Sequence, residues 1–207
     1  MVSAHDVPEE VLARLSEPRT SICGLDMSRA HLMGILNVTP DSFSDGGRHD
    51  ECSAAKAAAL RMLEDGASII DVGGESTRPG ADDVEEMEEI ARTAPVIAAI
   101  REVSAAPISI DTRKATVAME ALDAGASLIN DVSGFTFDAA LAPLAAQAGV
   151  PVCVMHSQGD PKTMQDSPTY ENVVLDVYDA LSAQVTSVST AAAAADAATD
   201  PDLPVLS

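Results

Sequence analysis

The chain has 207 residues, and 46% of them are hydrophobic, which is enough for a buried core and suits one domain. Thirty-three acidic residues against twelve Lys and Arg give a formal charge of −21, which disfavours binding to nucleic acid or to anionic membranes. No apolar run approaches the roughly 18 residues of a membrane span, and the N-terminus lacks a secretory pattern. We expect a salt-adapted (halophilic) cytoplasmic protein, with an ordinary acidic enzyme as the alternative.

The cysteines and histidines indicate neither a disulfide framework nor a zinc site. Three cysteines without a CxxC pair favour a reducing compartment; they are Cys23, Cys52 and Cys153. The four histidines show no HExxH-like spacing. These residues therefore agree with a cytoplasmic location.

From residue 31 onward, short apolar runs alternate with longer helical patterns. The short runs predict strands at 31–36, 68–72, 107–110, 127–131 and 151–155. Apolar stripes or alanine-rich stretches predict helices at 51–65, 87–100, 113–124, 137–148 and 170–198. Gly66 is expected to end the first helix, and Asp82 to cap the second, with Glu85 three residues later.

This alternation predicts a parallel α/β fold, and the even spacing of the units favours a (β/α)₈ barrel. A doubly wound sheet is the alternative. A whole barrel needs eight strands and about 250 residues, whereas the pattern supplies about five βα units. We therefore expect an N-terminal extension at 1–19 and a partial barrel at 20–207 that lacks the last units.

Polar residues follow each predicted strand, at the edge where barrel enzymes hold their active sites. Asn37, Asp71, Asp111, Asn130 and the pair Met155-His156 occupy these positions. Simple helix capping is the alternative reading for Asp111, and also for Asp131. The Gly-flanked loop at 73–80 brings hydroxyls and a guanidinium together, which suits an anion. The chain has neither a Walker-A loop nor a GxGxxG motif.

Two long segments and three short ones resemble dihydropteroate synthases, in the same order. They are MGILNVTPDSFSDGG at 33–47, GASIIDVGGESTRPGA at 66–81, ISIDTR at 108–113, LINDVSG at 128–134 and VMHSQG at 154–159. The resemblance runs from about residue 20 to residue 180. It implies a transferase of folate biosynthesis that joins 6-hydroxymethyl-7,8-dihydropterin diphosphate to p-aminobenzoate, giving 7,8-dihydropteroate and diphosphate.

The resemblance also implies roles for individual residues. Asn37 would bind the Mg²⁺–diphosphate group, and Asp111 and Asn130 would hold the pterin ring, with Met155 packed beside it. Thr77 and Arg78 would contact the diphosphate or the p-aminobenzoate. The loop at 39–48 would order over the substrates.

The chain also departs from the family pattern. The family's later pterin-binding aspartate, its SRK lysine and its arginine–histidine pair have no counterpart here. Three expectations follow: a truncated chain that is inactive alone, an enzyme completed by a C-terminal fragment, or a non-catalytic pterin-binding module. A pterin-dependent methyltransferase is a further enzyme alternative, and a homodimer is a further partner.

Overall fold

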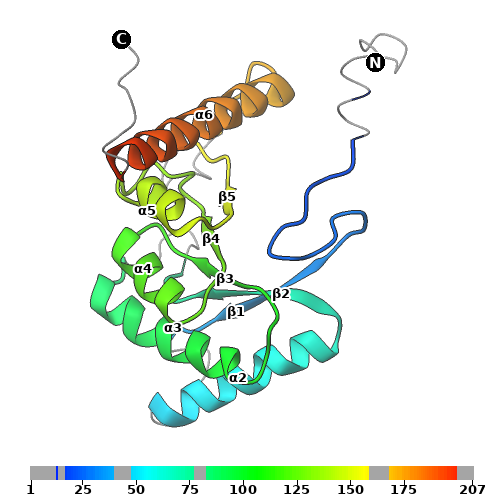
Figure 1. Ribbon diagram of the computed structural model, residues 1–207, viewed down its shortest axis with the longest axis vertical. Coiled ribbons are helices and arrows are strands. Elements are labelled where there is room, and N and C mark those ends of the chain that lie inside the picture. The colour runs from blue at the N-terminus through cyan, green and yellow to red at the C-terminus, as the bar shows by residue number, and fades with distance from the viewer. Residues whose placement is uncertain (1–12, 14–16, 40–47, 77–82, 159–167, 200–207) are drawn as a thin grey trace.

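The computed structural model describes residues 13, 17–39, 48–76, 83–158 and 168–199, in which five strands alternate with five helices (Figure 1). The strands are β1 Leu32–Asn37, β2 Ala67–Gly73, β3 Ile108–Asp111, β4 Leu128–Asp131 and β5 Val152–Val154. The helices are α2 Arg48–Glu64, α3 Glu86–Arg101, α4 Ala115–Asp123, α5 Leu141–Ala148 and α6 Val173–Thr199. None of these helices is long and apolar enough to cross a membrane.

All five predicted strands form, and their ends differ from the predictions by at most two residues. The helix starts were predicted less well. Helix α3 begins at Glu86, and its N-cap is Glu85, whose side chain makes no capping hydrogen bond. The predicted pair, in which Asp82 is the N-cap and Glu85 lies three residues later, is therefore wrong. Asp82 itself lies outside the described residues. Helix α5 begins at Leu141 and not at Phe137. Gly66 does follow α2 with a positive φ of 109°, a conformation that favours glycine.

The strands are parallel and lie in the order β1-β2-β3-β4-β5. This order never reverses, whereas a doubly wound sheet requires a reversal, so the doubly wound alternative is wrong. Figure 1 shows the helices following one another along one side of the strands. The architecture is that of five consecutive βα units of a (β/α)₈ barrel, as predicted.

The core lies between the sheet and the helices. Its strand side chains are fully buried and mostly β-branched, as expected for parallel strands covered by helices; they are Ile70, Val72, Ile108, Ile110 and Ile129. Alanines of α2 and isoleucines of α3 pack against them, notably Ala55, Ala59, Ile97 and Ile100. Because strand side chains alternate, the residues between these core positions face the opposite, concave side of the sheet.

Candidate functional site

One row of residues crosses all five strands near their C-terminal ends. Backbone register places Asn37 beside Gly73, Gly73 beside Asp111, Asp111 beside Asn130, and Asn130 beside Cys153. These positions alternate with the core residues and so lie on the concave side. Three of the predicted site residues, Asn37, Asp111 and Asn130, therefore share one row on one face.

Gly73 lies between Asn37 and Asp111 in this row and adds no side chain there. A Cβ atom at this position would lie 3.5 Å from Asp111 Oδ2 and 3.7 Å from Asn37 Oδ1. The glycine thus leaves the space between the amide and the carboxylate free of side-chain atoms. A ligand that enters the concave face can approach the backbone here.

Asp71 joins the site from two residues earlier on β2. Its Oδ2 accepts a hydrogen bond of 3.3 Å from Asn130 Nδ2. The other oxygen, Oδ1, is buried without a partner among the described residues, and the same holds for Asp111 Oδ1. Buried polar atoms are usually satisfied, so two such atoms on one face indicate a place where a ligand or water donates hydrogen bonds.

The two carboxyl groups also have raised pKa values. Burial, followed by the negative charges of Asp71 and Asp131, raises the pKa of Asp111 from 3.8 to about 7. Burial likewise raises the pKa of Asp71, which the neighbouring Ser109 and Asn130 side chains only partly offset. Near neutral pH, Asp111 therefore exists in both protonation states and can donate or accept a hydrogen bond. Shifted carboxyl groups in one cluster are typical of functional sites.

Neither Asp131 nor Asp111 caps a helix, and the hydrogen bonds of Asp131 are made within the loop that follows β4. Asp131 is fully buried, and its carboxylate accepts hydrogen bonds from the amides of Ser133 and Phe135, both at 2.7 Å. Its role is to shape the turn after β4. The first amide of α4, that of Ala115, is capped at 2.8 Å by Asp138 from the loop before α5, so Asp111 is not the cap of that helix.

The ends of β2 and β3 are joined by a buried ion-pair network. Lys114 Nζ contacts Glu89 Oε2 at 2.7 Å and Glu75 Oε1 at 3.3 Å. Arg113 contacts Glu75 Oε2 at 3.1 Å and Asp83 Oδ1 at 3.4 Å. Burial alone would raise the pKa of Glu75, but the Val84 amide and the two cations outweigh burial and lower it. Arg113 and Lys114, the two cations that follow Asp111 in the chain, therefore make their ion pairs with other carboxylates and not with Asp111.

Of the remaining predicted site residues, the structure describes Met155 but not Thr77 or Arg78. Met155 follows β5 directly and is half-buried, so it lies at the same edge of the sheet as the row. Thr77 and Arg78 lie outside the described residues, as does most of the loop at 39–48. His156 contacts the Tyr170 hydroxyl at 3.3 Å through Nε2.

The described residues contain no cluster of three or more His, Cys, Asp or Glu side chains able to hold a metal ion. Asn37 is exposed at the end of β1 and offers a single amide oxygen. Mg²⁺ commonly keeps several waters and takes its other ligands from substrate phosphates. Among the described residues, the donor set thus fits an ion that takes most of its ligands from water or from a bound substrate, and it does not form a metal centre of protein ligands alone.

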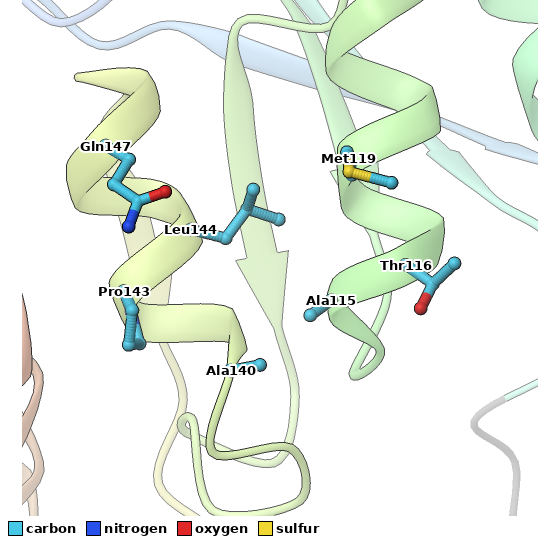
Figure 2. Close-up of a pocket in the computed structure, with 7 residues that line it drawn as sticks. All are labelled: Ala115, Thr116, Met119, Ala140, Pro143, Leu144 and Gln147. Carbon is cyan, nitrogen blue, oxygen red and sulfur yellow. The ribbon is translucent and has the colours of Figure 1, made fainter. Parts of the chain in front are cut away.

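A cavity of about 410 Å³ lies elsewhere, between α4 and α5 on the helix side (Figure 2). Its lining is mostly apolar and consists of Ala115, Thr116, Met119, Ala140, Pro143, Leu144 and Gln147. It contains no titratable group, whereas the strand row carries two shifted carboxyl groups. The candidate site is therefore the concave row, and the outer cavity provides a control position.

Sequence reasoning placed Asp71 at a strand end but assigned it no role in the site, and it missed the network around Lys114. A signal for Asp71 was present, because it lies at an even spacing from Gly73 and so faces the same side. The partners of Lys114 come from three separate segments, and no periodicity in the sequence joins them. Only the packed structure brings these charges together.

Comparison with known proteins supports this interpretation. The dihydropteroate synthase of Escherichia coli K12 is 52% identical over 153 residues, covering 74% of this chain and 54% of its own length. That of Synechocystis sp. is 48% identical over 157 residues, covering 76% and 54%. The crystal structure of Yersinia pestis dihydropteroate synthase with a sulfonamide drug superposes with a TM-score of 0.74 at 47% identity, covering 81% and 60%.

A second solved structure, Xanthomonas albilineans dihydropteroate synthase with 4-aminobenzoic acid, gives a TM-score of 0.75 at 42% identity, covering 86% of this chain and 63% of that one. The chain spans about half the length of the curated relatives it matches. Residues 33–203 match the family model described as pterin binding enzyme. Since this match covers most of the chain and includes the whole concave row, the chain belongs to the pterin-binding enzyme family.

Proposed function

We propose that this chain carries the pterin-binding half of a dihydropteroate synthase. In this reaction, the amine nitrogen of p-aminobenzoate forms a bond to the exocyclic carbon of the pterin as the bond from that carbon to the diphosphate oxygen breaks. The diphosphate leaves with the electron pair, and the amine loses a proton. The relatives at about 50% identity support the assignment.

In this proposal, Asp111 and Asn130 hold the pterin edge. A pterin ring presents donors and acceptors side by side, and a carboxyl group next to an amide can satisfy both kinds. Asp71 orients Asn130 by accepting from its Nδ2, so the amide oxygen of Asn130 is directed to the ligand. Met155 supplies a polarisable apolar contact at the same edge.

Asn37 would hold the Mg²⁺ that accompanies the diphosphate, and Thr77 and Arg78 would contact the anion. A bound Mg²⁺ supplies charge stabilisation to the leaving group. The protein's own contribution is to place the two substrates and to keep the ring oriented, since positioning alone can account for several kcal/mol of barrier lowering. The row itself contains no cation.

The observation that carries the proposal is the unpartnered Oδ1 atom of Asp111, in the same row as Asn130. The absence of a cation in the row favours one alternative, a pterin-binding module without catalysis. A methyltransferase-like function remains the other enzyme alternative, because it shares the need to hold a pterin. All three functions predict pterin binding, and only the synthase predicts product formation.

Calorimetry with 6-hydroxymethyl-7,8-dihydropterin diphosphate and Mg²⁺ tests the site. We expect saturable one-site binding in high salt, because we propose that the −21 charge reflects salt adaptation. Asn130→Leu should weaken binding at least tenfold, since a hydrogen bond to a charged or strongly polar group contributes about 1.5–3 kcal/mol. Addition of p-aminobenzoate should then yield dihydropteroate only if the synthase assignment is right.

Met119→Ala is the matched control, because Met119 lines the outer cavity. The dissociation constant of the pterin diphosphate for this variant should stay within twofold of that for the unchanged chain. The reverse pattern, in which Met119→Ala weakens binding and Asn130→Leu does not, would place the ligand between α4 and α5. A folded chain that binds no pterin would contradict the proposal altogether.

We also propose that further βα units complete this sheet, supplied by a complementing C-terminal fragment, with a homodimer as the alternative partner. Among the described residues, β1 pairs only with β2, and β5 only with β4. On β1, Leu32 is 66% exposed and Ile35 is 64% exposed. Open strand edges beside exposed apolar side chains favour pairing with another segment.

Size-exclusion chromatography with light scattering can test this completion. The chain is mixed with a fragment of the E. coli relative that covers the part of that protein beyond the match. We expect a one-to-one complex, and we expect a substitution of Ile35→Lys on the open strand to weaken it. A chain that remains monomeric with the fragment, or that forms only dimers of itself, would contradict the complementation proposal.

A further inference from the structure

We propose that Glu75, Glu89 and Lys114 form a clamp that fixes both ends of the segment between residues 76 and 83 against the end of β3. The three side chains are then positioning residues. Their expected effect on ligand binding rests on the proposed function, in which residues of this segment contact the anion. Their effect on the backbone does not rest on it.

The clamp holds both main-chain groups of Val84. Glu75 Oε1 accepts a hydrogen bond of 2.9 Å from the Val84 amide, and Lys114 Nζ donates one of 2.6 Å to the Val84 carbonyl. Glu75 itself follows β2 by two residues. One carboxylate and one ammonium group therefore tie the chain before residue 76 to the chain after residue 83.

The clamp is anchored in the protein interior. Glu89 is 0% exposed and Glu75 and Lys114 are 7% and 6% exposed. A Cβ atom on Gly74 would lie 3.0 Å from Glu89 Cγ and 2.8 Å from Thr93 Cγ2, so this glycine lets β2 approach α3 closely. Lys114 is the N-cap residue of α4 and lies three residues after Asp111 in the chain. The clamp thus relates the segment's ends directly to the strand that carries Asp111.

Arg113 extends the clamp toward the next loop. Besides its contacts with Glu75 and Asp83, its guanidinium carbon lies 4.2 Å from the ring centroid of Phe137. The two cations next to Asp111 are therefore used to hold backbone, and they leave the concave face to the carboxyl groups. Buried ion pairs often add little net stability, so a role in fixing geometry is the better account of this network.

Hydrogen–deuterium exchange of the chain without ligand tests the clamp directly. Lys114→Met removes the charge and keeps the length of the side chain. We expect exchange of peptides covering residues 74–84 to become at least tenfold faster, while peptides covering β3 and β4 change less than twofold. Lys56→Met is the matched control, since it removes a half-buried lysine paired with the exposed Glu102 at 3.5 Å, and it should leave both regions unchanged.

Glu75→Gln is a second variant that distinguishes a local effect from a general loss of structure. It keeps the shape of the side chain and the acceptor for the Val84 amide while removing the charge. It should raise exchange at 74–84 by a smaller factor, again without an effect on β3 and β4. Equal acceleration along the whole chain in Lys114→Met, together with no local change in Glu75→Gln, would overturn the proposal.

Ligand binding supplies the second measurement. Lys114→Met should weaken the binding of 6-hydroxymethyl-7,8-dihydropterin diphosphate at least tenfold. It should weaken the binding of 6-hydroxymethylpterin, which has no diphosphate, less than twofold. Equal weakening of the binding of both ligands would show a role that is only structural and would overturn the selective effect on the diphosphate. If the unchanged chain binds neither ligand, the proposed function fails, while the exchange experiment still decides the clamp.

Discussion

Replacing Asp111 by Asn should stabilise the folded chain at pH 8 and should weaken pterin binding at the same time. In the folded state, burial and neighbouring carboxylates raise the pKa of Asp111 from 3.8 to about 7. Each unit of pKa shift corresponds to about 1.4 kcal/mol, so the ionised carboxylate opposes folding by up to about 4 kcal/mol above pH 7. The neutral amide carries no such cost.

The effect should depend on pH in a defined direction. Between pH 3.8 and about 7, folded Asp111 holds a proton that the unfolded chain releases. The free energy of unfolding of the unchanged chain therefore falls as the pH rises through this interval and then levels off. In Asp111→Asn, the part of this fall that comes from Asp111 should be absent, while the raised pKa of Asp71 still contributes its own part. Urea unfolding at pH 5, 6, 7 and 8 measures the difference between the two chains, which should grow with pH.

Asp123→Asn is the control, because Asp123 is exposed near the end of α4 and keeps its hydration. The difference in unfolding free energy from the unchanged chain should stay within about 0.5 kcal/mol at each pH. A pH-independent difference for Asp111→Asn would mean that burial of this carboxyl group does not govern stability. A gain in stability together with at least tenfold weaker binding of the pterin diphosphate would identify Asp111 as a residue kept for function.

The strands and their order were predictable because the signal is local and periodic. Short apolar runs at about 30-residue spacing specify parallel strands with helices between them, and consecutive units lie side by side in a barrel. Helix starts were harder to predict. The N-terminus of α4 is capped by Asp138, 23 residues away, and that of α3 has no side-chain cap at all. A rule that looks for a nearby capping residue cannot find either start.

The site residues, too, fall into some that local sequence patterns predict and others that only the packed structure brings together. Asn37, Asp111 and Asn130 each end a strand, and knowledge of the fold is enough to bring such residues to one edge. Asp71 was missed because its importance comes from an unpartnered oxygen and from its bond to Asn130, 59 residues later. The clamp was missed because Lys114 immediately precedes a helix and resembles an ordinary surface lysine, although only 6% of it is exposed.

The opposite end of the sheet allows stability to be separated from function. Arg101, the last residue of α3, donates two hydrogen bonds to the Gly125 carbonyl, at 3.1 and 2.8 Å. It donates two more to the carbonyls of Ser104 and Ala106, at 3.1 and 2.9 Å. These carbonyls precede β3 and β4, at the N-terminal edge of the sheet. In barrel enzymes this edge contributes to stability and the other edge carries the chemistry.

Arg101→Met should therefore lower the free energy of unfolding by about 2–4 kcal/mol, because it removes charge-assisted bonds and leaves part-buried carbonyls without a donor. The dissociation constant of the pterin diphosphate, measured on the folded protein, should stay within twofold. Arg92→Met is the comparison, since Arg92 makes one part-buried pair with Glu88 and one bond to the Gly74 carbonyl, and its replacement should lower the free energy of unfolding by less. If Arg101→Met changed binding as much as Asn130→Leu does, the two ends of the sheet would be coupled, and stability and ligand binding would not be separable.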